Sequence, residues 1–138
     1  VITYEGAIEF RLHVLRSFEV AEPGSLIRYL GTSPQWHSVV DKKTEEKLIK
    51  IQKDKKLRLR GIAAEPFKKI RPWLASANEL TELRYHPLVG SDTNNVEILD
   101  DRICIQSFVA PYLAIEIVNK EVAKNYQSYF DFLWSKTK

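Results

Sequence analysis

The sequence predicts one α/β domain with a mixed parallel and antiparallel sheet flanked by helices. In the first half, short apolar runs alternate with amphipathic segments, an order that favours parallel strands joined by helices. From residue 95 onward, apolar runs follow one another with only short turns between them, which favours antiparallel pairing. At 138 residues, without a repeat or a linker, the chain has the usual size of one domain, residues 1–138.

The first half begins with a predicted helix and a predicted strand. Residues 4–20 place Ile8, Leu12 and Leu15 at helical spacing, which predicts an amphipathic helix. Residues 25–30 form a short apolar run bounded by glycines, which predicts a buried strand.

Two more helices and two more strands are expected before residue 90. Residues 36–52 carry apolar side chains among charged ones and predict one helix, and residues 57–62 alternate in polarity as a strand does. A helix opening at Pro66 is expected to reach Asn78, with a kink at Pro72 or a division into two short helices there. Residues 81–85 are expected to form the third strand.

The second half predicts a meander followed by a last helix. Strands are expected at residues 96–99, 103–108 and 113–118, with a tight turn at Asp100 and Asp101. Asn119 is expected to cap the helix, whose aromatic-rich apolar stripe contains Val122, Tyr126, Tyr129, Phe130, Leu133 and Trp134.

Composition narrows the class of protein. Cys104 is the only cysteine and lies in an apolar run, so neither a disulfide framework nor a cysteine-rich metal site is expected. No apolar run approaches the length of a membrane span, and the start at Val1 lacks the layout of a secretory signal, so we expect an excised piece of a cytoplasmic protein. A net charge of +3 does not by itself indicate nucleic-acid binding, and the basic run at residues 53–60 is expected to be a solvated helix end.

The three histidines show no spacing typical of a metal site, and no cofactor is expected. His13 is expected at the surface or the boundary of its helix. His37 follows the carboxyl end of a predicted strand, where ligands bind in open α/β sheets. The alternative is that Thr32 or Ser33 simply caps the helix start there.

Six short segments, each weakly specific alone, follow one another in a characteristic order: residues 4–6, 30–33, 82–87, 98–103, 115–119 and 129–134. In this order they resemble the C-terminal domain of TrmB-type transcriptional regulators, which is similar in fold to one half of a phospholipase D-like enzyme. The resemblance covers nearly the whole chain.

The same resemblance argues against catalysis. Phospholipase D-like enzymes carry an HxKxxxxD motif, and placing Asp100 on its Asp puts Thr93 at the His and Asn95 at the Lys. Threonine forms no phosphoenzyme at neutral pH, and asparagine supplies no cation to a phosphoryl group. We therefore expect no enzyme activity.

The resemblance implies an effector-sensing and dimerising domain, with DNA bound only by an N-terminal winged helix outside this chain. We expect a homodimer, no membrane partner, and a small-molecule effector such as a sugar. The binding pocket for this effector would lie near the degenerate motif, with a few polar groups set over apolar walls. The alternative is a vestigial pocket that side chains fill. The polar candidates for binding are Ser33, His37, Thr93, Asn95, Glu97 and Ser107. Two alternatives stay open: the degenerate half of a phospholipase D-type phosphodiesterase or nuclease, and a dimerisation module without a ligand.

Overall fold

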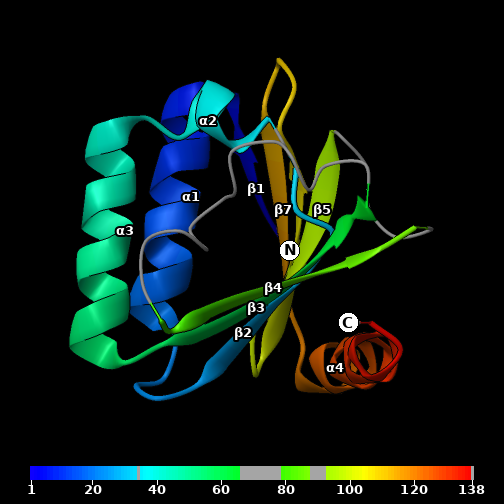
Figure 1. The fold of residues 1–138 in the computed structure, drawn as a ribbon. Coiled ribbons are helices and arrows are strands. Elements are labelled where there is room, and N and C mark those ends of the chain that lie inside the picture. The colour runs from blue at the N-terminus through cyan, green and yellow to red at the C-terminus, as the bar shows by residue number, and fades with distance from the viewer. Residues whose placement is uncertain (34, 66–78, 88–92, 138) are drawn as a thin grey trace.

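A computed structural model describes residues 1–33, 35–65, 79–87 and 93–137 (Figure 1). In these residues seven strands form one sheet in the order β1-β7-β6-β5-β2-β3-β4. The strands are β1 Ile2–Glu5, β2 Leu26–Leu30, β3 Arg58–Ala64, β4 Thr81–His86, β5 Asn94–Ile98, β6 Arg102–Ser107 and β7 Leu113–Val118. The helices are α1 Gly6–Val20, α2 Trp36–Val39, α3 Lys42–Lys55 and α4 Lys120–Ser135.

The sheet is mixed, as predicted. Strand β3 pairs in parallel with β2 and β4, whereas β5, β6, β7 and β1 form an antiparallel succession that joins β2 through β5. The parallel strands come from the alternating half of the sequence, and the antiparallel ones come mainly from the meander. The predicted fold class is confirmed.

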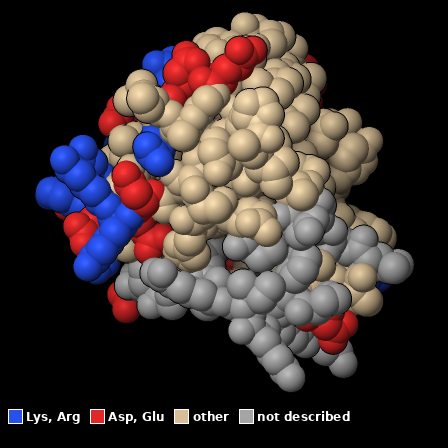
Figure 2. Space-filling view, turned by 90° about the horizontal axis from the view of Figure 1, so that it is seen from above, with Lys and Arg blue, Asp and Glu red and all other residues tan. Residues whose placement is uncertain are grey.

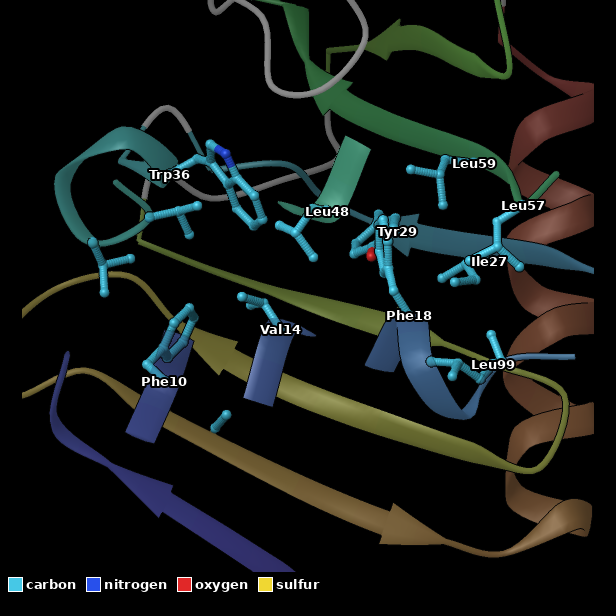
Figure 3. Packing of buried hydrophobic residues seen from close by; sticks show 14 of the residues in the cluster. Phe10, Val14, Phe18, Ile27, Tyr29, Trp36, Leu48, Leu57, Leu59 and Leu99 are labelled. Carbon is cyan, nitrogen blue, oxygen red and sulfur yellow. The ribbon is translucent and has the colours of Figure 1, made fainter. Parts of the chain in front are cut away.

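Helices cover both faces of the sheet. Figure 1 shows α1 and α3 side by side on one face and α4 across the other. Below α1 and α3 lies the larger apolar cluster, in which side chains of α1 meet those of β2, β3 and α3 (Figure 3). It includes Phe10, Val14, Phe18, Ile27, Leu48, Leu57 and Leu59.

Helix α4 docks through aromatic and ionic contacts. Phe130 and Trp134 are buried against Ile62, Ile98 and Ile103 of the sheet. The guanidinium of Arg84 lies 4.1 Å from the centroid of the Trp134 ring, and that of Arg60 lies 5.1 Å from it. Tyr129, which the sequence places in the apolar stripe, is instead 55% exposed.

The predicted start of the chain is wrong in two respects. Residues 2–5 form an edge strand antiparallel to β7, so α1 begins only at Gly6. The buried face of α1 also differs from the predicted one, since Ile8 and Leu12 are 74% and 58% exposed. The face toward the sheet carries Phe10, His13, Val14, Ser17 and Phe18.

This difference has a physical cause. Helix α1 covers strands that present polar groups as well as apolar ones, so its inner face contains His13 and Ser17 between the aromatic residues. The apolar positions of the sequence therefore do not mark the inward face by themselves. The expectation that His13 lies at the surface is wrong, because its side chain is 0% exposed.

The single helix predicted for residues 36–52 is two helices. The chain leaves helical geometry at Val40 and Asp41, and the Asp41 carboxylate accepts a 2.9 Å hydrogen bond from the backbone N–H of Thr44. An aspartate that caps the first turn of α3 explains the break. The helix predicted from Pro66 to Asn78 lies outside the described residues.

The side chain of Lys55, at the end of α3, binds the carboxyl end of α1. Its ammonium donates to the backbone carbonyls of Phe18, Glu19 and Ala21, at 3.0 Å for Phe18 and 2.9 Å for Ala21. These groups belong to the carboxyl end of α1, where carbonyls lack partners within the helix and the helix dipole favours a cation.

Replacing Lys55 by Met should lower the free energy of unfolding by about 1 to 3 kcal/mol, because the last carbonyls of α1 lose a charged donor. Urea denaturation followed by circular dichroism measures this change. The matched control is Lys53→Met on the same helix, where the side chain is exposed. Equal stability of the two variants would show that the contact with α1 contributes nothing.

Candidate functional site

The structure separates the six predicted binding residues. Asn95 pairs with Gln106 and Glu97 pairs with Cys104 across β5 and β6, and these side chains face α1. Ser107 pairs with Asn94. Because side chains alternate along a strand, Ser107 points to the opposite face of the sheet from Asn95 and Glu97, which is the face that α4 covers. Asn95 and Glu97 thus share one site, and Ser107 does not belong to it.

Ser33 and His37 lie beyond the carboxyl end of β2. The Ser33 hydroxyl accepts a 3.0 Å hydrogen bond from the backbone N–H of Gln35, the residue before α2, so it closes a turn there, while α2 itself has no side-chain cap. The His37 Nδ1 lies 3.4 Å from a carboxylate oxygen of Glu45, and the same oxygen accepts from the Trp36 indole at 3.2 Å. A hollow of about 480 Å³ borders His37, Val40, Asp41, Lys42, Glu45 and Glu46.

The three positions aligned with the HxKxxxxD motif are spread along β5. Thr93 immediately precedes the strand, Asn95 lies in its first half and Asp100 follows its end. At about 3.3 Å per residue, Thr93 and Asp100 are roughly 20 Å apart. Asp100 lies instead beside a cavity of about 260 Å³ near the end of α1 and the start of α4.

A polar cluster lies between α1 and the sheet, around the two predicted residues Asn95 and Glu97. Its members come from α1, β2, β5 and β6, and each is at least 95% buried: His13, Ser17, Tyr29, Asn95, Glu97, Cys104 and Gln106. Apolar side chains of the larger core cluster adjoin it: Phe10 packs edge-on against the His13 ring at a centroid distance of 5.9 Å. The cluster is therefore shielded from water.

Glu97 is the centre of this polar cluster. Ser17 donates to one carboxylate oxygen at 2.7 Å, and the Tyr29 hydroxyl donates to the other at 2.5 Å. The Cys104 thiol lies within 4.8 Å of a Glu97 carboxylate oxygen. Burial and the neighbouring carboxylate both raise the pKa of Tyr29 well above its ordinary value, so its hydroxyl remains a donor at neutral pH.

His13 and Gln106 complete the polar cluster. The Gln106 amide nitrogen lies 2.9 Å from His13 Nε2, which in turn lies 4.0 Å from a Glu97 oxygen. Desolvation lowers the pKa of His13 despite the carboxylates of Glu97 and Glu116, so the imidazole is neutral at pH 7. Three side-chain atoms of this cluster find no hydrogen-bond partner among the described residues: His13 Nδ1, Gln106 Oε1 and Asn95 Oδ1.

An ion-pair network adjoins the polar cluster on β6 and β7. Glu116, register partner of Cys104, binds the Arg102 guanidinium and accepts from the Tyr4 hydroxyl at 3.3 Å. Arg102 also makes a two-pronged contact with Asp101 at 2.8 and 3.0 Å. The buried carboxylate of Glu116 is therefore paired with the guanidinium of Arg102.

The chemistry of the polar cluster suits binding better than nucleophilic attack. Burial raises the pKa of the Cys104 thiol, with a further rise from the carboxylates nearby, so the thiol stays protonated at neutral pH. A protonated, enclosed thiol is a poor nucleophile. The neutral imidazole and the carboxylate remain available as ligands or hydrogen-bond acceptors.

Sequence reasoning missed His13, Ser17, Tyr29, Cys104 and Gln106 as members of this site. A signal was present in the strands, because Asn95, Glu97, Cys104, Gln106 and Glu116 interrupt apolar runs at alternate positions. Period-two spacing places such residues on one face of a sheet. No sequence pattern indicates that α1 lies over that face.

Seen from above, the molecule carries few charged side chains over the middle of this face. Most of the described atoms there belong to other residues, Asp and Glu lie toward the edges, and most of the Lys and Arg lie at one side (Figure 2). The exposed lysines of α3 include Lys42, Lys43, Lys47 and Lys50. As predicted, several cations of the basic run are solvated, Lys53 and Lys56 among them.

Comparison with known proteins identifies a related fold. No protein-family model and no curated protein matches the chain. Among solved structures, it is similar to TrmBL2, described as an archaeal chromatin protein with a novel mode of DNA binding, at a TM-score of 0.63 and 14% identity. The match covers 99% of this chain and 53% of TrmBL2, so the chain spans about half the length of that protein. Among the described helices, none is both long and apolar enough to cross a membrane.

Replacing Tyr29 by Phe should lower the free energy of unfolding by about 1.5 to 3 kcal/mol, because a buried carboxylate loses a hydrogen-bond donor. Chemical denaturation at pH 7 checks the value. The control is Tyr112→Phe, whose hydroxyl makes an exposed 3.5 Å contact with the Ser38 carbonyl and should change stability by less than about 0.5 kcal/mol. A Tyr29 variant as stable as the control would mean that Glu97 does not depend on this bond.

Proposed function

We propose that residues 1–138 form the effector-sensing and dimerising domain of a TrmB-like transcriptional regulator, and that the domain catalyses no reaction. The observation that carries the proposal is the fold shared with TrmBL2 over nearly the whole chain. Because the chain spans about half of that protein, a DNA-binding winged helix is proposed to lie in a separate, N-terminal part of the protein, with the protein working in the cytoplasm.

The proposed sensing site is the region around Asn95 and Glu97. Asn95 is 5% exposed, and its side-chain amide oxygen has no hydrogen-bond partner among the described residues. Thr93 immediately precedes the same strand, and its backbone carbonyl accepts a 2.7 Å hydrogen bond from the Phe108 N–H. Neutral donors and acceptors over apolar walls suit the hydroxyl groups of a sugar or another polyol.

Ser33 and His37 are proposed as an outer part of the same site. Trp36 packs against Phe108 at a ring-centroid distance of 5.9 Å, and Ser38 contacts the Phe108 carbonyl at 3.5 Å. Phe108 thereby links α2 with the start of β5. We leave Ser107 out of the proposed site, because it lies on the α4 face.

A regulatory effect requires that the effector bind one arrangement of the protein better than another. A coupling of about 1 to 3 kcal/mol between the effector and DNA is typical of such proteins. Helix α1 is the element through which we propose the effect travels, because it covers Asn95 and Glu97 and contributes Ser17 to the bond network.

Two alternative functions remain distinct from this proposal. If the chain is half of a phospholipase D-type enzyme, the imidazole and the cation of the HxKxxxxD motif must come from another part of the protein, since Thr93 and Asn95 occupy the aligned positions. The chain as a dimerisation module without an effector would leave the polar cluster a purely structural feature. Hydrolysis of bis(4-nitrophenyl) phosphate by the domain at neutral pH would support the enzyme and contradict our proposal.

Analytical ultracentrifugation should give a mass of about twice 16.0 kDa for the domain at micromolar concentration. A dimer follows from the proposal, because DNA regulators commonly match the two-fold symmetry of their operators. A single species at the monomer mass across the accessible concentrations would remove dimerisation from the proposed role.

A panel of mono- and disaccharides should contain one that raises the melting temperature saturably, because a ligand of the folded state stabilises it. In Asn95→Ala this shift should disappear. The matched control is Asn94→Ala, since Asn94 is the exposed neighbour on the same strand and its substitution should preserve the shift. Loss of the shift in both variants, or in neither, would displace the site from Asn95.

A further inference from the structure

Three potential metal ligands converge inside the polar cluster. His13 comes from α1, Glu97 from β5 and Cys104 from β6, and one ligand atom of each lies within 4.8 Å of the other two. All three side chains are buried, with exposures of 0, 1 and 0%. The sequence separations of these residues do not follow any metal-binding motif, so only the folded chain brings them together.

The distances are close to those of a tetrahedral site. With bonds of about 2.0 to 2.3 Å, neighbouring ligands of a zinc ion lie roughly 3.3 to 3.7 Å apart. His13 Nε2 and the Glu97 oxygen are already 4.0 Å apart. None of the three separations exceeds 4.8 Å, so shifts of about 1 Å in the ligand atoms would bring the three donors to coordination distance.

The electrostatics of Glu97 favour a cation at this point. Arg102 pairs with Glu116 and Asp101, whereas no Lys or Arg of the described residues lies within ion-pair distance of Glu97. A buried carboxylate is costly unless it is paired or coordinates a metal. Hydrogen bonds from Ser17 and Tyr29 orient Glu97, as outer partners orient the ligands of metal sites.

A fourth donor lies beside the three. The Gln106 amide is 2.9 Å from His13, and its Oε1 has no hydrogen-bond partner among the described residues. Turning the amide by half a revolution directs this oxygen toward the same place. In that orientation the oxygen takes the position of the amide nitrogen, 2.9 Å from His13 Nε2, where it is within reach of an ion held by His13.

We propose that His13, Glu97 and Cys104, with the amide oxygen of Gln106, bind one Zn²⁺ ion between α1 and the sheet. Imidazole, thiolate and carboxylate together suit zinc better than Mg²⁺ or Ca²⁺, which take oxygen ligands. On binding, the S–H bond of Cys104 breaks, a Zn–S bond forms and the proton passes to solvent. The proposal does not depend on the regulatory function, and the four protein donors leave the metal closed, as in a structural site.

Cobalt titration of the metal-free domain provides the first test. Co²⁺ should bind with one-to-one stoichiometry and give the intense visible bands of tetrahedral coordination together with a thiolate charge-transfer band in the near ultraviolet, and one equivalent of Zn²⁺ should abolish both. The weak spectrum of aqueous Co²⁺ throughout the titration would overturn the proposal, whatever any variant does.

Variants assign the ligands. In Cys104→Ser the charge-transfer band should vanish, and in His13→Gln zinc affinity, measured by competition with a chromophoric chelator, should fall at least tenfold. His86→Ala is the matched control, because His86 lies on β4, the edge strand that β2 and β3 separate from β5, and it should keep the wild-type spectrum. Loss of the bands in His86→Ala with their retention in Cys104→Ser would place the metal outside the polar cluster and contradict the proposal.

The melting temperature separates the outcome for the zinc site from the outcome for the sensing function. Zn²⁺ should raise the melting temperature of the wild-type domain, with saturation at one equivalent, and should leave that of a folded Cys104→Ser variant unchanged. An equal rise in both proteins would contradict the proposal. A sugar-dependent shift that survives without zinc would preserve the sensing function independently of this result.

Discussion

The carboxylate of Glu97 lies in the interior between α1 and the sheet, where a charge removed from water must be met by donors. Ser17 from α1 and Tyr29 from β2 provide them. This requirement determines the rotation of α1 about its axis, because the helix has to present Ser17 and His13 to the sheet. Ile8 and Leu12 are consequently left toward solvent.

The apolar clusters depend on the same arrangement. Phe10, Val14 and Phe18 alternate with the polar residues of α1, so each turn of the helix places an aromatic or aliphatic side chain beside the polar cluster. These neighbours exclude water and strengthen the hydrogen bonds that Glu97 accepts. Any group that binds Glu97 would affect the positions of α1, β2 and β5 together. The proposed sensing site and the proposed zinc site both depend on this arrangement.

Much of the architecture could be predicted from local patterns. The strands around Tyr29, Leu59 and Ile103 follow apolar or alternating runs, and Asn119 caps α4 as expected, with its side chain accepting from the Val122 N–H at 3.0 Å. The break at Asp41 was missed because a capping aspartate resembles an ordinary charged residue on a helix surface. The edge strand β1 was missed because its pairing partner, β7, is over a hundred residues away.

The sequence by itself determined the mixed sheet, the order of its parallel and antiparallel halves, and the placement of Asn95 and Glu97 on one face, because strand alternation and helix periodicity are local properties. Only the tertiary structure decided that Ser107 lies on the other face, that His13 is buried, and that Cys104 and Gln106 meet it below α1. Register and helix rotation depend on contacts between segments distant in the chain. Those contacts arise from burying the polar cluster and its apolar neighbours together, which no local pattern encodes.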